Sequence, residues 1–145
     1  MEKIRLIVVS DKDRVSLRPK IKSWLEQNNN LEVVLLSRLK ISRIRGEIKP
    51  KNPTLVFITA SLYTSEEFNE LCGFVKKLRK HLPKTNIIVN TPRLSEDKRE
   101  KLFEGGVDDW IDDSVEYPFS GRTLKSIVKK KKIPYLSQAI IKKTG

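Results

Sequence analysis

The sequence has 145 residues, which suits one domain with a short appendage, and 38% of them are hydrophobic. Its single cysteine, Cys72, excludes a disulfide framework and a cysteine-based zinc site, and its single histidine, His81, leaves little material for histidine-dependent catalysis. The net charge of +12 makes an acidic partner a candidate. No apolar run is long enough for a membrane span and no signal-peptide layout precedes the first apolar run, so we expect a cytoplasmic protein.

Five short apolar runs bounded by polar residues are typical of strands that are buried on both faces. In chain order they cover residues 4–9, 31–36, 54–60, 86–90 and 107–111. Helical patterns alternate with these runs. In chain order the patterns cover residues 15–25, 41–48, 68–82, 95–104 and 120–128. This alternation predicts an α/β three-layer sandwich with a five-stranded parallel sheet in flavodoxin-like order.

Three of the helical patterns indicate which side chains face the core. The second is basic, with Ile41, Ile44 and Ile48 on one side and an expected break at Gly46 or Pro50. The third follows a capping box at residues 64–67 and stops at Pro83. Its apolar stripe consists of Phe68, Leu71, Cys72, Val75, Leu78 and Leu82. The fourth is polar and is expected to be anchored by Leu102 and Phe103.

Charge is distributed unevenly along the chain. Residues 38–51, 76–84 and 122–143 are basic, and residues 104–116 are acidic. The basic surface residues singled out are Arg38, Lys40, Arg43, Arg45, Lys49, Lys51, Lys129, Lys130, Lys131 and Lys132. They predict a surface for an acidic protein or for nucleic-acid phosphates, or else a solvated face. The acidic run is expected to be a solvated loop rather than a metal site, and His81, in the last turn of a helix, is expected to be partly positive.

Residues 1–128 form the predicted domain, and residues 129–145 form a basic tail. The tail contains apolar residues that suit a short amphipathic helix, namely Ile133, Leu136, Ala139, Ile140 and Ile141. Such a helix would pack on its own domain or on a partner.

Several short segments occur in an order and spacing known from one family. They are Ile7–Asp11, Asn52–Thr59, Ile87–Thr91, Glu104–Ile111 and Pro118–Ser120. Together they resemble the receiver domain of bacterial response regulators, the CheY-like fold, from about Lys3 to Val128. The resemblance implies a signalling role in a two-component system.

The same resemblance places non-standard residues at the phosphorylation site. A receiver needs a carboxylate nucleophile, an acidic pair that holds Mg²⁺ and a lysine that pairs with the phosphoryl oxygens. Thr59 falls at the nucleophile position, and its neutral hydroxyl cannot form an acyl phosphate. Ser10 and Asp11 fall at the acidic pair, with Asp13 as a distant candidate, and Asp113 falls at the lysine position. The resemblance is therefore to a degenerate member, a pseudo-receiver.

The resemblance retains the residues that receivers use to pass a signal to a partner, which form the output side of the domain. Thr91 and Trp110 fall at the switch threonine and the aromatic residue, and Tyr117 falls at the lysine position if residues 114–117 are an insertion. In receivers the face made by helix four, strand five and helix five docks partners, which implies a partner or homodimer face here. The alternative is that Thr91 is a strand-end hydroxyl and Trp110 a packing aromatic.

These features together predict a stand-alone regulatory protein that acts by phosphorylation-independent protein–protein recognition. We expect no enzymatic activity, no cofactor and no metal. An alternative is a nucleic-acid-associated regulatory protein that uses the basic surface on phosphates, although no helix-turn-helix, zinc-finger or RNA-binding signature is present. A metal-dependent phosphotransfer enzyme is disfavoured by Thr59.

Overall fold

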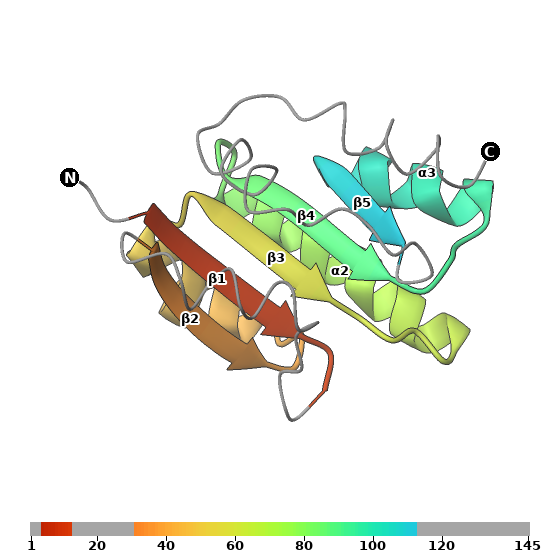
Figure 1. The fold of residues 1–145 in the computed structure, drawn as a ribbon, viewed down its shortest axis with the longest axis horizontal. Helices are drawn as coiled ribbons and strands as arrows, with labels where there is room; N and C mark the ends of the chain where they lie inside the picture. Colours follow the sequence, from red (N-terminus) through yellow and green to blue (C-terminus); the bar gives the residue numbers. More distant parts are fainter. Residues whose placement is uncertain (1–3, 13–30, 113–145) are drawn as a thin grey trace.

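The computed structural model describes residues 4–12 and 31–112, and five strands within these ranges form one parallel sheet. The strands are β1 (Ile4–Ser10), β2 (Leu31–Ser37), β3 (Leu55–Thr59), β4 (Asn86–Thr91) and β5 (Asp109–Asp112). Their order is β2-β1-β3-β4-β5 (Figure 1). The predicted α/β class and flavodoxin-like order are confirmed. The helices expected over 15–25 and 120–128 lie outside the described residues.

The described helices pack on one face and one end of this sheet. They are η1 (Ile44–Ile48), η2 (Lys49–Lys51), α2 (Ser65–His81) and α3 (Glu96–Gly105). In Figure 1, η1, η2 and α2 lie behind the strands and α3 lies beside β5. Ile44 of η1 and Phe74 of α2 join Val56 and Val89 of the sheet in one buried core. Val8 and Phe57, which point to the opposite face, are buried too, as expected of a parallel sheet.

The basic segment after β2 differs from its predicted form. Ile44 and Ile48 are fully buried, but Ile41 lies before η1 and is 51% exposed, so the prediction that Ile41 shares their face is wrong. Residues 44–48 form a π-helix, on which Ile44 and Ile48 lie about one wide turn apart, whereas Ile41 lies in the turn before it. Gly46 lies inside η1, and the change to the 3₁₀-helix η2 occurs just before Pro50.

Helix α2 begins as the capping box predicts, with the Thr64 hydroxyl accepting a hydrogen bond from the Glu67 N–H at 3.2 Å. Its inner face differs at two positions. Phe74, which the predicted stripe omits, is fully buried, whereas Cys72 is only partly buried. Burial nevertheless raises the pKa of the Cys72 thiol above its usual value, against the smaller opposing effects of Lys76 and Lys101. The thiol is therefore protonated at neutral pH, which suits a structural role.

Helix α3 is anchored by one residue instead of two. Leu102 is fully buried, but Phe103 is 42% exposed, so the prediction that Phe103 anchors this helix is wrong. In a helix adjacent residues point in directions about 100° apart, and in α3 Leu102 is the one of this pair that faces the core. The helix ends at Gly106, whose φ of 114° lies in the left-handed region.

Arg79 of α2 connects three parts of the chain at the edge where the strands begin. Its guanidinium donates hydrogen bonds to the carbonyls of Leu82, Thr85 and Gly106 at 2.7–3.0 Å, and it pairs with Asp108 at 2.6 Å. A Cβ atom on Gly106 would lie 2.6 Å from the Cγ atom of Arg79, so the turn passes too close to this side chain for any larger residue. The end of α2, the start of β4 and the turn before β5 are thus held together.

Within the described residues no helix is both long enough and apolar enough to cross a membrane. The predicted boundary at residue 128 and the tail at 129–145 lie outside these residues.

Candidate functional site

The candidate site lies at the carboxyl-terminal edge of the sheet, where parallel strands end together. The register places Ser10 of β1 beside Ser37 of β2 and beside Thr59 of β3, and it places Thr59 beside Asn90 of β4. The strand ends therefore carry a row of neutral hydroxyl and amide side chains. Ser10 and Asn90 are buried, and Thr59 is partly buried. The structure thus brings the predicted residues Ser10 and Thr59 together.

Main-chain hydrogen bonds fix the chain around Thr59. The Asp11 N–H donates to the carbonyl of Thr59 at 3.1 Å, and the Ala60 N–H donates to the carbonyl of Asn90 at 3.0 Å. The Lys12 N–H donates to the hydroxyl oxygen of Ser10 at 3.2 Å. The loops that follow β1 and β3 are therefore tied to the neighbouring strands.

The Asp11 carboxylate at this edge binds the loop after β3. The Oδ2 atom of Asp11 accepts a hydrogen bond from the Ser61 N–H at 2.8 Å. In the ranges 4–12 and 31–112 no group of three or more Asp, Glu, His or Cys side chains is placed to hold a metal ion. Asp13 and Asp113, the other acidic residues assigned to the site, lie outside the described residues. Asp11, the described carboxylate next to Thr59 at this edge, is therefore already hydrogen-bonded.

Lys12 and Tyr63, which the sequence does not single out, meet at the mouth of the site. The Nζ atom of Lys12 lies 3.5 Å from the Tyr63 hydroxyl and 5.2 Å from the centre of its ring. Tyr63 is 77% exposed. Both residues follow strands that end at the same edge, and this shared location is the signal from which the contact could have been expected.

Thr91 and Trp110, the predicted switch residues, are directly bonded. The Trp110 indole N–H donates to the Thr91 hydroxyl oxygen at 2.8 Å, and that hydroxyl donates to the carbonyl of Pro92 at 2.6 Å. Both side chains are buried, and the guanidinium of Arg99 lies 5.4 Å from the indole ring. A partner on this side would therefore touch the residues that cover the pair, not the pair itself. Tyr117, the third residue assigned to this face, lies outside the described residues.

The acidic segment divides between surface and interior. Asp108 accepts hydrogen bonds from Arg79 at 2.6 Å and from the Ile87 N–H at 2.7 Å. Asp109 is buried, and its carboxylate accepts a hydrogen bond from the Trp110 N–H at 2.8 Å. The prediction of a wholly solvated loop is wrong for Asp109, because β5 begins at this residue and carries its side chain inward.

The predicted basic surface residues with described positions lie on and around η1 and η2. Arg38, Lys40, Arg45 and Lys49 are exposed, and Arg43 and Lys51 are partly buried. Arg43 pairs with Glu47 at 3.1 Å. Lys129, Lys130, Lys131 and Lys132 lie outside the described residues.

His81 lies where this basic segment meets the end of α2. Partial desolvation and then the positive charges of Arg45, Lys49, Lys80 and Lys77 lower the pKa of His81 from its usual 6.5. The prediction of a partly positive imidazole is therefore wrong, and the ring is neutral at pH 7. Partial desolvation and the cations of η1 and η2, which are distant in sequence, both act against the favourable end of the helix dipole.

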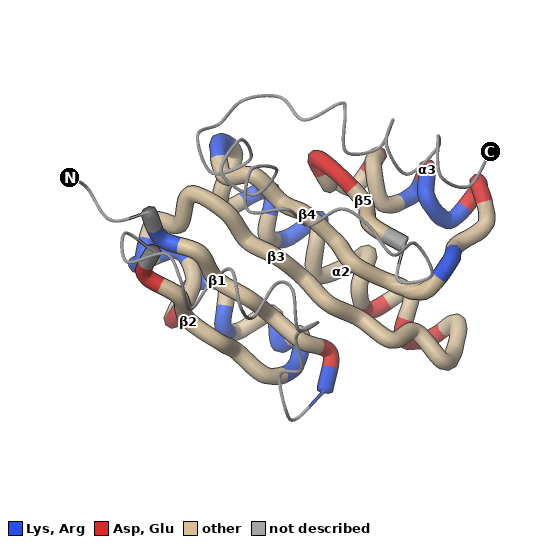
Figure 2. The backbone as a smooth tube through the Cα atoms, in the orientation of Figure 1, with Lys and Arg blue, Asp and Glu red and all other residues tan. Residues whose placement is uncertain are grey.

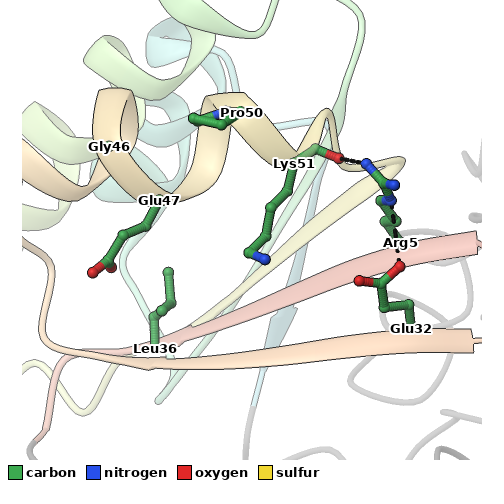
Figure 3. A pocket seen from close by; sticks show the side chains of 7 residues that line it. All are labelled: Arg5, Glu32, Leu36, Gly46, Glu47, Pro50 and Lys51. Carbon is green, nitrogen blue, oxygen red and sulfur yellow. Dashed lines mark hydrogen bonds and ion pairs between the residues drawn. The ribbon is translucent and has the colours of Figure 1, made fainter.

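A cavity of about 580 Å³ opens between the η1–η2 segment and the strands β1 and β2 (Figure 3). Its charged lining residues are Arg5, Glu32, Glu47 and Lys51. Arg5 spans the space between Glu32, 3.4 Å away, and the carbonyl of Lys51, 2.7 Å away. The lining carries both signs of charge and its arginine is already bonded, so it does not select one class of ligand.

No protein-family model matches the sequence, and no curated protein is similar to it. Solved structures do share its fold. The receiver domain of RcsB from Salmonella enterica serovar Typhimurium has a TM-score of 0.65 and 16% identity, over 91% of this chain and 93% of that one. A response regulator from Thermotoga maritima has a TM-score of 0.65 and 17% identity, over 88% of this chain and 98% of that one.

A CheY-like protein, TadZ, from Pseudomonas aeruginosa PAO1 has a TM-score of 0.61 and 11% identity, over 88% of this chain and 98% of that one. At these identities the likeness concerns the fold. The chain therefore has the CheY-like fold of response-regulator receiver domains.

Proposed function

We propose that this chain is a phosphorylation-independent pseudo-receiver that acts as a protein–protein interaction module in a signalling or regulatory assembly. The observation that carries the proposal is Thr59 at the end of β3, between Ser10 and Asn90. A neutral hydroxyl at this position cannot form the acyl phosphate that a receiver aspartate forms. The receiver fold itself supports the signalling role.

The rest of the edge supports the absence of phosphotransfer chemistry. The Asp11 carboxylate accepts a hydrogen bond from the Ser61 N–H. A cation that binds this carboxylate would have to displace that N–H or share the carboxylate with it. A Mg²⁺ ion needs near-octahedral oxygen ligands, and the hydroxyls of Ser10 and Thr59 are weaker ligands than carboxylates. We therefore propose that this edge catalyses no phosphotransfer and holds no Mg²⁺ ion.

The bonded pair of Thr91 and Trp110 supports a single output conformation. Thr91 uses its hydroxyl both as a donor to Pro92 and as an acceptor from Trp110. Turning the hydroxyl toward Thr59 would break both bonds in a buried place, where an unpaired polar group costs about 1–3 kcal/mol. A switch that depends on such a movement is disfavoured.

We place the protein partner on the surface of α3 and β5. Phe103 of α3 is 42% exposed, and a partly exposed aromatic residue is typical of the centre of a protein interface. The net charge of +12 attracts an acidic partner at long range. A second copy of the chain on this surface is the homodimer that the resemblance implies.

Affinity capture from an extract of the native host tests this proposal. Tagged full-length protein is incubated with nuclease-treated extract, with and without acetyl phosphate and Mg²⁺. We expect one defined protein to be retained equally in both arms, and Phe103→Glu to reduce its recovery at least about tenfold, because a charge at the centre of an interface is strongly disfavoured. The matched control, Tyr63→Glu, changes an exposed aromatic residue at the other end of the sheet and should leave recovery unchanged.

Retention that requires acetyl phosphate would contradict phosphorylation independence. Equal losses in Phe103→Glu and Tyr63→Glu would contradict the placement on α3. Sedimentation of the purified chain shows whether the retained protein is a second copy.

A further inference from the structure

Two basic segments that are far apart in the sequence meet on one side of the molecule. Residues 43–51 cover η1, η2 and the N-cap residue before them, and residues 76–84 cover the end of α2 and the turn after it. Ile44, Ile48 and Leu78 belong to the same buried core, so the two elements pack together. We call the exposed residues Arg45, Lys49, Lys77 and Lys80 the basic face.

The positive charges of the basic face are not neutralised by described neighbours. Among residues 4–12 and 31–112, the ion pairs are Arg5–Glu32, Arg43–Glu47 and Arg79–Asp108, which leave these four cations out. The acidic residues of α2 lie at its opposite end, as the red and blue segments of Figure 2 show. The lowered pKa of His81 is a second sign that the charges of both segments act at one place.

The basic face lacks the features of a protein interface. The exposed large hydrophobic residues of the described chain are Leu35, Ile41, Tyr63 and Phe103, and none lies in 43–51 or 76–84. Interface centres are enriched in aromatic residues and depleted in lysine. A phosphate backbone requires only positive side chains.

The spacing of the cations and the composition of the two basic segments also suit phosphate binding. Lys77 and Lys80 are three residues apart on one helix, about 5–6 Å between Cβ atoms. That is shorter than the Debye length of about 8 Å at physiological salt, so their potentials add. Neither segment contains Asn, Gln, Phe, Tyr or Trp, the side chains that commonly read or stack on bases.

We propose that the basic face binds the phosphate backbone of nucleic acid without reading its sequence. This goes beyond the proposed function, because it uses η1, η2 and α2 and leaves the surface of α3 and β5 for a protein. Each cation placed on a phosphate releases a counterion, so binding weakens steeply as salt rises.

Fluorescence anisotropy of a short labelled duplex of scrambled sequence tests this inference. Full-length protein is titrated into duplex DNA, and separately into duplex RNA, over a series of salt concentrations. The test variant carries Arg45→Gln, Lys49→Gln, Lys77→Gln and Lys80→Gln. We expect it to bind at least about 30-fold more weakly at moderate salt, with a log–log salt slope shallower by roughly 3–4, since each phosphate contact contributes about 0.9.

The matched control carries Lys12→Gln, Arg93→Gln, Lys98→Gln and Lys101→Gln. It loses the same charge from exposed positions outside the basic face. We expect its affinity to fall less than about threefold and its salt slope to stay the same. Circular dichroism melting of both variants confirms that they are folded.

His81 provides a readout on the face itself. Its NMR signal is unique, because the sequence contains one histidine. Phosphates that neutralise the neighbouring cations should raise its pKa toward 6.5 when duplex is added. An equal loss of affinity in both variants, or an unchanged affinity in the test variant, overturns the inference. Binding of a polyglutamate peptide to the basic face with no binding of either duplex overturns it in favour of an acidic protein.

Discussion

Replacing Arg79 by methionine is expected to lower the free energy of unfolding by about 3–4 kcal/mol. The side chain is 23% exposed, and its guanidinium donates to the carbonyls of Leu82, Thr85 and Gly106, which lose these bonds when it is removed. Asp108 loses its ionic partner as well. Methionine keeps much of the aliphatic length, so the loss reports the hydrogen bonds and the charge.

Urea denaturation of the full chain, followed by far-ultraviolet circular dichroism, measures this loss. Lys77→Met is the control, because Lys77 lies two residues earlier in α2, is exposed and makes no ion pair among the described residues. It should change the free energy of unfolding by less than about 0.5 kcal/mol. A loss below about 1 kcal/mol for Arg79→Met would mean that the three segments do not depend on this side chain.

Replacing Thr91 by valine is expected to lower the free energy of unfolding by about 2–3 kcal/mol. Valine has nearly the same shape but no hydroxyl, so the buried Trp110 indole N–H loses its acceptor and the carbonyl of Pro92 loses its donor. Thr91→Ser keeps the hydroxyl and removes one methyl group, which costs about 1 kcal/mol by itself.

The same urea measurement compares the two Thr91 variants. A larger loss for valine than for serine shows that the hydrogen bonds, rather than the packing of the methyl group, hold the pair. Equal losses, or a larger loss for serine, would contradict the assignment of Thr91 and Trp110 as a bonded unit and remove one support for the single output conformation.

The strands could be predicted from the sequence because continuous apolar runs report burial on both faces, and a flavodoxin-like order was the simplest fit to their alternation with helices. The carboxyl-terminal edge followed from that order, and with it the closeness of Ser10 and Thr59. The bond from Ser61 to Asp11 could not be predicted in the same way, since its donor is a main-chain N–H in a loop. The position of Asn90 beside Thr59 was not predicted either, because Asn90 is a polar residue at the end of an apolar run.

Helix faces were less predictable than strands. Phe74 lies beside the expected stripe of α2, yet α2 packs against both the sheet and η1, which widens its buried face beyond one stripe. Ile41 and Ile44 separate because the helix begins only after Ile41, which lies in the preceding turn, and the helical spacing does not show this start. The sequence did not indicate that Arg79 joins three segments, because most of its acceptors are main-chain carbonyls.

The electrostatics of the basic face also could not be predicted without knowledge of the fold. The sequence identifies two basic segments, but only the packing of η1 on α2 brings Arg45 and Lys49 near His81. Partial desolvation and, after it, this positive charge lower the pKa of the histidine at the end of α2, opposite to the expectation. Long-range contacts of this kind decide local pKa values, and a helix dipole considered alone does not predict them.

The most direct test of the central claim, that this receiver fold does not switch through an aspartyl phosphate, is a pair of ¹H–¹⁵N correlation spectra. One is recorded on the full chain alone, and the other with excess Mg²⁺ and the phosphomimetic beryllofluoride. We predict no chemical-shift changes at Asp11, Thr59, Ser61 or Thr91 beyond those that salt causes. Saturable shifts at Thr59 and Ser61 that extend to Thr91 and the Trp110 indole N–H would contradict the claim and show a working switch.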